Sequence, residues 1–173
     1  RRASQIRARF PALQVLPLFA ETGTLIVSPA LWRAAPLARP ADLTRAILLS
    51  TETRPGEWNA WLERAGCPDL RPVQELRFDH YFVTLQAVVD GMGYGMGPFP
   101  TLVSERELGR ILAPFPELQV PGETYHALVP LDADKPRHLR AFLEWLAQEA
   151  AEGLSAPAAP AAVHPGSGRR RRS

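Results

Sequence analysis

Between residues 71 and 100, the order of apolar and polar residues predicts a strand, a turn, a helix and a second strand. Val73, Leu76 and Phe78 form a short apolar run that ends the first strand. Asp79 follows at the place of a helix N-cap, because its carboxylate can accept hydrogen bonds from the unpaired N–H groups of the next turn. A helix that starts directly after a strand leaves those N–H groups facing outward, where they can bind an anion.

The helix itself is predicted from four apolar residues at three- and four-residue spacing: Phe82, Leu85, Val88 and Val89. Gly91 and Gly93 predict its end, since glycine enters the left-handed conformation of a helix C-terminus without steric cost. The glycines of residues 91–97 are spaced G-x-G-x-G-x-G and follow a helix. They therefore do not form the G-x-G-x-x-G turn of a dinucleotide site, which follows a strand.

The rest of the chain continues this alternation of strands and helices. Strands are predicted over these apolar runs: 13–19, 24–28, 47–50, 111–115 and 124–129. Helices are predicted over these stretches: 30–35, 40–43, 56–66, 101–109 with Leu102 and Leu108 inward, and 135–152. The alternation indicates an α/β fold built from βαβ units. The chain start, 1–12, is expected to be disordered or irregular, and the Ala- and Pro-rich tail, 153–173, to be disordered.

Composition places the chain among soluble globular proteins. Apolar residues make up 46% of it and charged residues 22%, which is ordinary for that class. No run approaches the roughly 18 to 20 apolar residues that a membrane span needs, and the first residues contain no apolar core of a signal peptide. The single cysteine, Cys67, excludes an internal disulfide and fits a reducing compartment. We therefore expect a cytoplasmic protein without membrane association.

The charge distribution argues against a nucleic-acid-binding surface. The net charge is +2, but the tail alone contributes the run Arg169–Arg172, so residues 1–152 carry a small negative net charge. The run could bind phosphate or acidic surfaces, although a solubilising tail is the simpler interpretation. Basic residues are almost all arginine, with Lys135 the one lysine. Together with abundant alanine and proline, this suggests a GC-rich, bacterial coding sequence.

No motif in the sequence supports catalysis or metal binding. The histidines show no ligand spacing, and a second cysteine that would help them is absent: His80, His126, His138 and His164. There is no G-x-S-x-G elbow and no P-loop, and the carboxylates are not paired for acid–base work. We expect neither an enzyme nor a cofactor or metal site.

Five blocks, in order, resemble the effector-binding part of LysR-type transcriptional regulators: ILLSTETRPGEWNAWLERAG, FDHYFVTLQAVVDGMGYGMGP, LGRILAPF, TYHALVP and HLRAFLEWLAQEA. They are most similar to the branch that contains the glycine-cleavage activator and the β-lactamase regulator. The preceding LQVLPLFAETGTLIVSPAL resembles the strand that crosses from the first effector subdomain into the second. The resemblance covers residues 10–150.

The resemblance implies a type 2 periplasmic-binding-protein-like fold, with two Rossmann-like lobes and a ligand in the cleft between them. It implies that 22–112 form a complete lobe two, and that 13–21 and 113–152 are the remnant of lobe one. The family's winged helix-turn-helix, linker helix and first half of lobe one have no counterpart in these blocks. We therefore expect an N-terminally truncated effector-binding domain that does not bind DNA directly.

The incomplete lobe has a physical consequence for the last predicted helix. Its apolar stripe would lack the elements on which it normally packs: Leu139, Phe142, Leu143 and Leu146, with Trp145 at the border. An uncovered stripe of this kind promotes association. We expect the isolated chain to be oligomeric, or partly molten outside residues 22–112, unless the helix folds back on lobe two.

The resemblance also implies where an effector would bind. Lobe two would contribute the helix start, with these residues: Asp79, His80, Tyr81 and Thr84. Lobe one would contribute Tyr125, and fixed backbone N–H groups at the helix start favour an anionic small molecule. Structural alternatives remain for three of them. Asp79 can be a simple N-cap, His80 an exposed turn residue, and Tyr125 a strand residue that packs on lobe one.

Two hypotheses about function follow. The leading one is the ligand-sensing portion of a regulator, which binds a small metabolite and forms a homo-oligomer. The alternative is a protein-interaction module that dimerises with an intact LysR-type paralogue. A periplasmic solute-binding protein is disfavoured because no signal peptide is visible, and an enzyme is the least favoured class.

Overall fold

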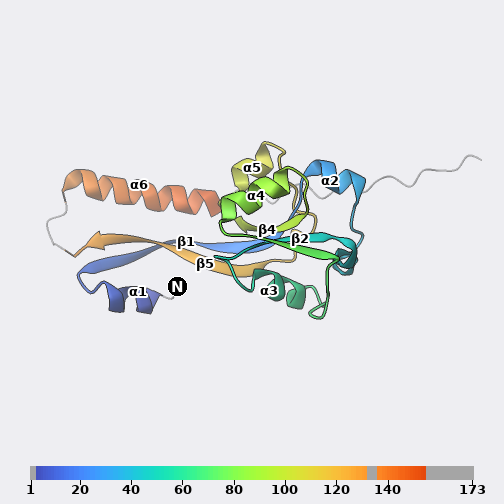
Figure 1. The fold of residues 1–173 in the computed structure, drawn as a ribbon. Coiled ribbons are helices and arrows are strands. Elements are labelled where there is room, and N and C mark those ends of the chain that lie inside the picture. The colour runs from blue at the N-terminus through green and yellow to red at the C-terminus, as the bar shows by residue number, and fades with distance from the viewer. Residues whose placement is uncertain (1–2, 132–135, 155–173) are drawn as a thin grey trace, which may run out of the picture.

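A mixed five-stranded sheet organises the computed structural model, which describes residues 3–131 and 136–154 (Figure 1). The strands lie in the order β3-β2-β4-β1-β5. Their bounds are as follows: β1 (Leu13–Ile26), β2 (Ile47–Thr51), β3 (Gln74–Phe78), β4 (Tyr94–Phe99) and β5 (Val120–Pro130). Strand β2 pairs in parallel with β3 and β4, whereas β1 is antiparallel to β4 and β5. The predicted α/β class and the parallel βαβ units are confirmed.

Helices cover both faces of the sheet, with α2, α4, α5 and α6 on one side and α1 and α3 on the other (Figure 1). Their bounds are as follows: α1 (Ala3–Arg9), α2 (Pro29–Ala34), α3 (Glu57–Arg64), α4 (Tyr81–Val89), α5 (Val103–Glu107), α6 (Arg137–Leu154) and the 3₁₀ helix η1 (Pro40–Arg45). Gly91 adopts φ +79° and ends α4, as its sequence position predicts.

The core consists of two apolar layers, one on each face of the sheet. Successive strand residues alternate between the layers, because side chains in a strand point to opposite faces. Leu25 packs in the layer of Trp61 from α3, and the next residue, Ile26, packs in the layer of Val88 from α4. All four side chains are fully buried.

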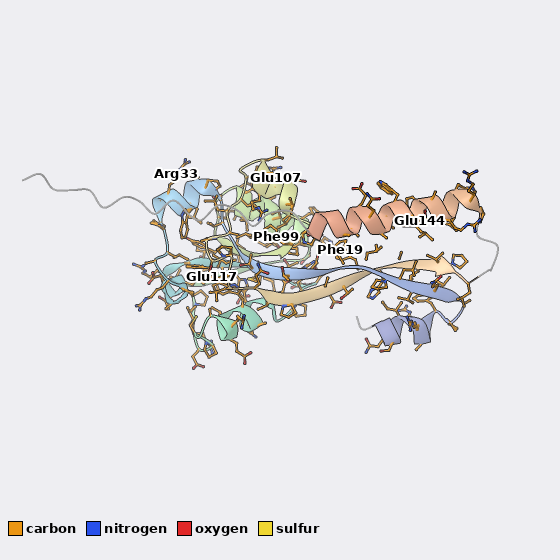
Figure 2. The ribbon with its side chains drawn as sticks, turned by 180° about the vertical axis from the view of Figure 1, so that it is seen from behind. Phe19, Arg33, Phe99, Glu107, Glu117 and Glu144 are labelled. Carbon is orange, nitrogen blue, oxygen red and sulfur yellow. The ribbon has the colours of Figure 1, made fainter. Side chains whose placement is uncertain are left out.

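Strands β1 and β5 continue beyond the rest of the sheet as a two-stranded ribbon (Figure 1). Strand β1 pairs with β4 only from Thr22 onward, whereas it pairs with β5 from Leu13. Helices α1 and α6 lie on opposite faces of the ribbon (Figure 1). We call the ribbon with its two helices (residues 3–20, 124–131 and 136–154) the arm, and residues 21–123 the body. Phe19 lies on β1 where the ribbon leaves the body (Figure 2).

Several predicted elements differ from the structure because long-range pairing decided their extent. Residues 13–26 form one strand rather than two, since β5 pairs along nearly all of it through two register shifts. Residues 111–115 do not form a strand; Leu112 only makes an isolated bridge with Val27. Residues 3–9, expected to be irregular, form α1, whose Ile6 is half-buried.

The burial of three predicted helix faces also differs. Phe82 is 70% exposed, and α4 instead buries Thr84, Ala87 and Val88. In the short helix α5, Leu102 is buried as predicted but Leu108 is exposed. Helix α6 follows the ribbon with Leu139 and Leu143 half-buried, while Phe142 points outward. The stripe is therefore partly covered by the arm's own ribbon. The tail is expected to be disordered from residue 153, but α6 continues to Leu154; from residue 155 onward the expectation lies outside the described residues.

Candidate functional site

A partly buried ionic triad, in which Glu21 is fully buried and the other two members are half-buried, lies beyond the carboxyl end of β2. Arg54, in the loop between β2 and α3, donates from Nη1 to Oε1 of Glu57 at 2.9 Å and from Nη2 to Oε2 of Glu21 at 3.0 Å. Glu57 is the first residue of α3, and Glu21 belongs to β1. One guanidinium thus connects the loop, the helix start and the strand that leads into the arm.

The electrostatics of the triad are unbalanced, because two carboxylates share one cation. Burial acts to lower the pKa of Arg54, but its hydrogen bonds with Glu57 and Glu21 outweigh burial and leave that pKa raised. Burial raises the pKa of Glu57, and the charge of Glu21 adds to this effect against the opposing pull of Arg54. The triad therefore holds its excess negative charge at a cost.

Two tyrosines flank the triad. The guanidinium carbon of Arg54 lies 5.0 Å from the ring centroid of Tyr81, which is cation–π distance. The Tyr81 hydroxyl is buried and meets no hydrogen-bond partner among the described residues, and burial raises its pKa. Tyr125, on β5, stacks on Phe19 with ring centroids 4.7 Å apart. Burial raises the pKa of Tyr125, and the negative charge of Glu21 raises it further.

A groove of about 570 Å³ opens beside the triad. Its walls come from the β2–α3 loop, the start of α3, and the segments of β1 and β5 where the arm joins the body. The polar side chains in the lining include the triad together with Glu123 and Tyr125. The loops beyond the carboxyl ends of parallel strands are the usual place for a ligand in an open α/β sheet. We call this hollow the junction groove.

Two other hollows fit a ligand site less well. One, about 650 Å³, lies over the β2–β3 edge, shares Arg54 and Glu57 with the junction groove, and adds Arg71, Glu75 and Arg77. Another, about 580 Å³, lies at the amino ends of β2 and β4 beside Met92. The first extends the triad toward solvent, and the second lies away from the loops that usually bind ligands.

The residues predicted at the start of α4 occupy three different environments. Asp79 is exposed and is not the N-cap; that position belongs to His80, whose side chain makes no capping hydrogen bond. The ring of His80 stacks on the exposed Phe82, with centroids 5.8 Å apart. The prediction failed at Asp79 because the helix begins one residue later than the N-cap preference of aspartate indicated.

Thr84 and the two tyrosines have clearer roles. Thr84 is buried, and its hydroxyl hydrogen-bonds that of Thr51 at 2.8 Å. This bond fixes α4 against the end of β2 and leaves the hydroxyl inside the core. Tyr81 and Tyr125, by contrast, are brought to the same triad from α4 and β5, which are well separated along the chain.

The triad was missed by sequence reasoning. Arg54 and Glu57 have the i,i+3 spacing of a local ion pair across a helix start, and Glu21 is one carboxylate within a long apolar strand. A single buried charge in such a strand requires a partner. That signal could have marked Glu21, but only the tertiary structure shows that Arg54 is the partner.

The described residues contain no group of three or more metal-ligating side chains placed to hold an ion. None of the described helices has the length and apolar content needed to cross a membrane.

The sheet, its helices and the groove at the strand ends define an effector-binding domain of the periplasmic-binding-protein-like type 2 class. The structure is similar to the effector domain of the regulator AmpR of Pseudomonas aeruginosa, with a TM-score of 0.65 and 28% identity, over 83% of this chain and 68% of that one. The LysR substrate binding domain model matches residues 2–151, and the chain belongs to this family. The family resemblance and the fold class predicted from sequence are confirmed.

Sequence relatives support the same assignment. The glycine cleavage system transcriptional activator of Escherichia coli K12 is 28% identical over 146 residues, which cover 84% of this chain and 48% of the relative. The regulator TrpI of Pseudomonas aeruginosa is 31% identical over 142 residues, which cover 80% of this chain and 47% of the relative. The chain thus spans about half the length of the curated relatives that it matches.

Proposed function

We propose that this chain is the effector-sensing part of a cytoplasmic transcriptional regulator and binds a small molecule in the junction groove. The observation that carries the proposal is the groove at the carboxyl end of β2, with the partly buried triad in its wall. Family membership supports a regulatory rather than a catalytic role, since the relatives are transcriptional regulators. In this proposal, another part of the regulator binds DNA.

The proposed division into lobes places this groove between them. Residues 22–112 would form lobe two, and 13–21 with 113–152 would belong to lobe one. Two observations support the division. Strand β1 shifts register between Ala20 and Thr22, and the ribbon leaves the body at the same point. A ligand in the groove would contact both sides of this boundary and hold the arm against the body.

The proposed effector contacts are Tyr125, which lines the groove, and Tyr81 with the start of α4, which lie beside it next to Arg54. The first N–H groups of α4 have no side-chain cap from His80, so they can receive an anionic group of the effector. Asp79 and His80 would border that position as exposed residues, and Thr84 would position the helix start through Thr51. Tyr125 would contact the effector from the arm.

A ligand screen tests the proposal. We expect some members of a small-metabolite library to raise the thermal unfolding temperature of the chain, because a ligand that binds only the folded state stabilises it by about 2.7 kcal/mol at a hundred times its Kd. Tyr125→Ala should weaken a hit by about tenfold or more. Phe142→Ala, which removes an aromatic ring outside the groove, should leave binding unchanged. Equal binding to both variants would remove the groove from the proposal.

A second candidate, association with another copy of this chain, is favoured by the outer face of α6. Phe142 and Trp145 are 51% and 53% exposed, with ring centroids 5.7 Å apart, and an exposed aromatic pair of this kind favours association. Light scattering after size-exclusion chromatography should show a dimer that dissociates in the Phe142→Ser, Trp145→Ser double variant. A monomeric parent chain would refute it, and capture only by an intact LysR-type paralogue would favour the interaction-module alternative.

A further inference from the structure

The junction groove carries more negative than positive charge. Its lining contains the carboxylates of Glu21 and Glu57, which share one guanidinium, that of Arg54. Both terminal nitrogens of Arg54 already donate to carboxylates at 2.9 and 3.0 Å. An anion that enters this part of the groove would meet like charges at short range, whereas a cation would meet opposite ones.

Glu21 provides an independent sign that a positive group is expected here. Its side chain is 1% exposed, and a buried carboxylate needs donors for both oxygens. Oε2 accepts from Arg54, whereas Oε1 has no partner at full hydrogen-bonding geometry among the described residues; the Tyr125 hydroxyl interacts with the same carboxylate, and this contact helps to raise the pKa of Tyr125. A buried polar atom without a partner in a native structure calls for an explanation.

Glu21 lines the junction groove, so its Oε1 belongs to the candidate binding site. Its carboxylate lies between Arg54, which it contacts, and Tyr125, whose titration it influences, and both of these residues line the groove. On the β5 side, a Cβ at Gly122 would lie 2.9 Å from the Cβ of Glu21. The backbone at Gly122 therefore lies so close to Glu21 that a side chain at this position would clash with it.

We propose that the junction groove binds a protonated amino group of the ligand between Glu21, Glu57 and Tyr125. This inference rests on the proposed function and names the ligand class: a small molecule with an ammonium group in the groove and, as the proposed function has it, an anionic group toward the start of α4, which does not itself line the groove. An ammonium presents three donors. They match the unused Oε1 of Glu21, the second oxygen of Glu57 and the hydroxyl of Tyr125, and the excess negative charge of the triad is neutralised.

Matched ligand triplets test the inference on the full chain. The probes are the common α-amino acids, their N-acetyl derivatives, which lack the ammonium, and their amides, which lack the carboxylate. Isothermal titration calorimetry should detect binding of at least one amino acid. Its N-acetyl derivative should bind about tenfold or more weakly, as expected when a hydrogen bond to a buried charge is lost.

Variants connect that result to the triad. Glu57→Gln keeps the shape and removes the charge, so it should weaken the amino acid about tenfold while leaving its N-acetyl derivative unaffected. Glu63→Gln, an exposed carboxylate on the same helix, is the matched control and should change neither. Glu21→Gln should weaken binding of the amino acid further, and circular dichroism verifies that this variant folds. If Glu21→Gln does not fold, the Glu57→Gln variant alone decides the test.

The possible results separate this inference from the proposed function. If an N-acetyl derivative binds as tightly as its parent and Glu57→Gln changes neither, the amino-group inference is overturned while effector binding stands. If no member of the triplets binds but the metabolite screen finds a purely anionic ligand, the inference is again overturned and the proposed function stands. If both experiments find no ligand, both are overturned.

Discussion

The body and the arm of this domain are built from the same sheet but are stabilised very differently. In the body, helices cover both faces, and apolar side chains such as Leu25, Ile26 and Trp61 are fully buried. In the arm, a two-stranded ribbon carries one helix on each face, and its buried apolar residues are Val15 and Val129 among the described ones. A ribbon of two strands has little independent stability.

This contrast indicates where a ligand can act. The free energy of local opening in a protein ranges from near zero to the full free energy of unfolding, according to local packing. The arm belongs to the weakly packed end of that range and the body to the other. The junction groove is lined by residues of the body and by Tyr125 of the arm, so a ligand bound there, as proposed, would hold the arm against the body.

The largest expected effect comes from removing a core side chain of the body. Leu25→Ala should lower the free energy of unfolding by about 2–5 kcal/mol, because it leaves a cavity in a closed layer. Leu139→Ala, the matched change in the half-buried stripe of α6, should cost less than about half as much. Urea denaturation measures both. Equal costs would break the contrast between body and arm.

Added volume tests the same contrast in the opposite direction. A methyl group at Gly93 would lie 2.5 Å from the carbonyl oxygen of Ile47 on the neighbouring strand. Gly93→Ala should therefore destabilise the body by about 1–3 kcal/mol. Gly23→Ala is the control, since its methyl would meet a side-chain carbon of Val120 at 3.2 Å, which can shift more easily than backbone. A Gly93→Ala variant as stable as the parent would show that the body is loosely packed.

The hydrogen bond between the Thr51 and Thr84 hydroxyls tests how tightly the body is packed near the groove. Thr84→Val should cost about 1–2 kcal/mol, because it leaves the buried Thr51 hydroxyl without its partner. The Thr51→Val, Thr84→Val double variant should recover part of that loss, since no buried hydroxyl then remains unpaired. Chemical denaturation of the parent and three variants gives the coupling energy. Additive costs would show that the two hydroxyls act independently.

The smallest expected effect is the pH dependence contributed by Glu57. Its pKa in the folded state is raised above the ordinary glutamate value of 4.5. Above pH 4.5, this carboxyl therefore holds more protons in the folded chain than in the unfolded one. Stability should therefore fall as the pH rises from 4.5 through the folded pKa. Glu57→Gln should remove this part of the pH dependence, so the total loss of stability over the range should shrink by less than about 1 kcal/mol. Thermal unfolding between pH 4 and 7 measures the slope, and an unchanged slope would contradict the assignment.

Much of the fold was predictable because it rests on local signals. The helix over 57–64 and the buried strand over 47–51 follow from apolar periodicity and from the glycine at position 66. The candidate site was predictable only in part. Tyr81 and Tyr125 lie at the triad as side chains from the predicted region, but Asp79 and His80 are exposed and Thr84 is inside the core.

The failures share one physical cause. The exposure of Phe82 depends on which side of α4 the neighbouring elements cover, and a helical stripe of apolar residues does not specify that side by itself. The length of β1 depends on its pairing with β5, about a hundred residues later in the chain. Likewise, Glu21 and Arg54 are 33 positions apart, and no local pattern relates them.

By itself, the sequence determined the class of fold, most of its elements and the family, because these depend on periodicity, turn residues and block similarity along the chain. Only the tertiary structure decided that β1 and β5 extend into an arm and that Arg54 joins two carboxylates beside a groove. Ion pairs and strand pairing depend on distances in space, and those distances are set by how the layers pack.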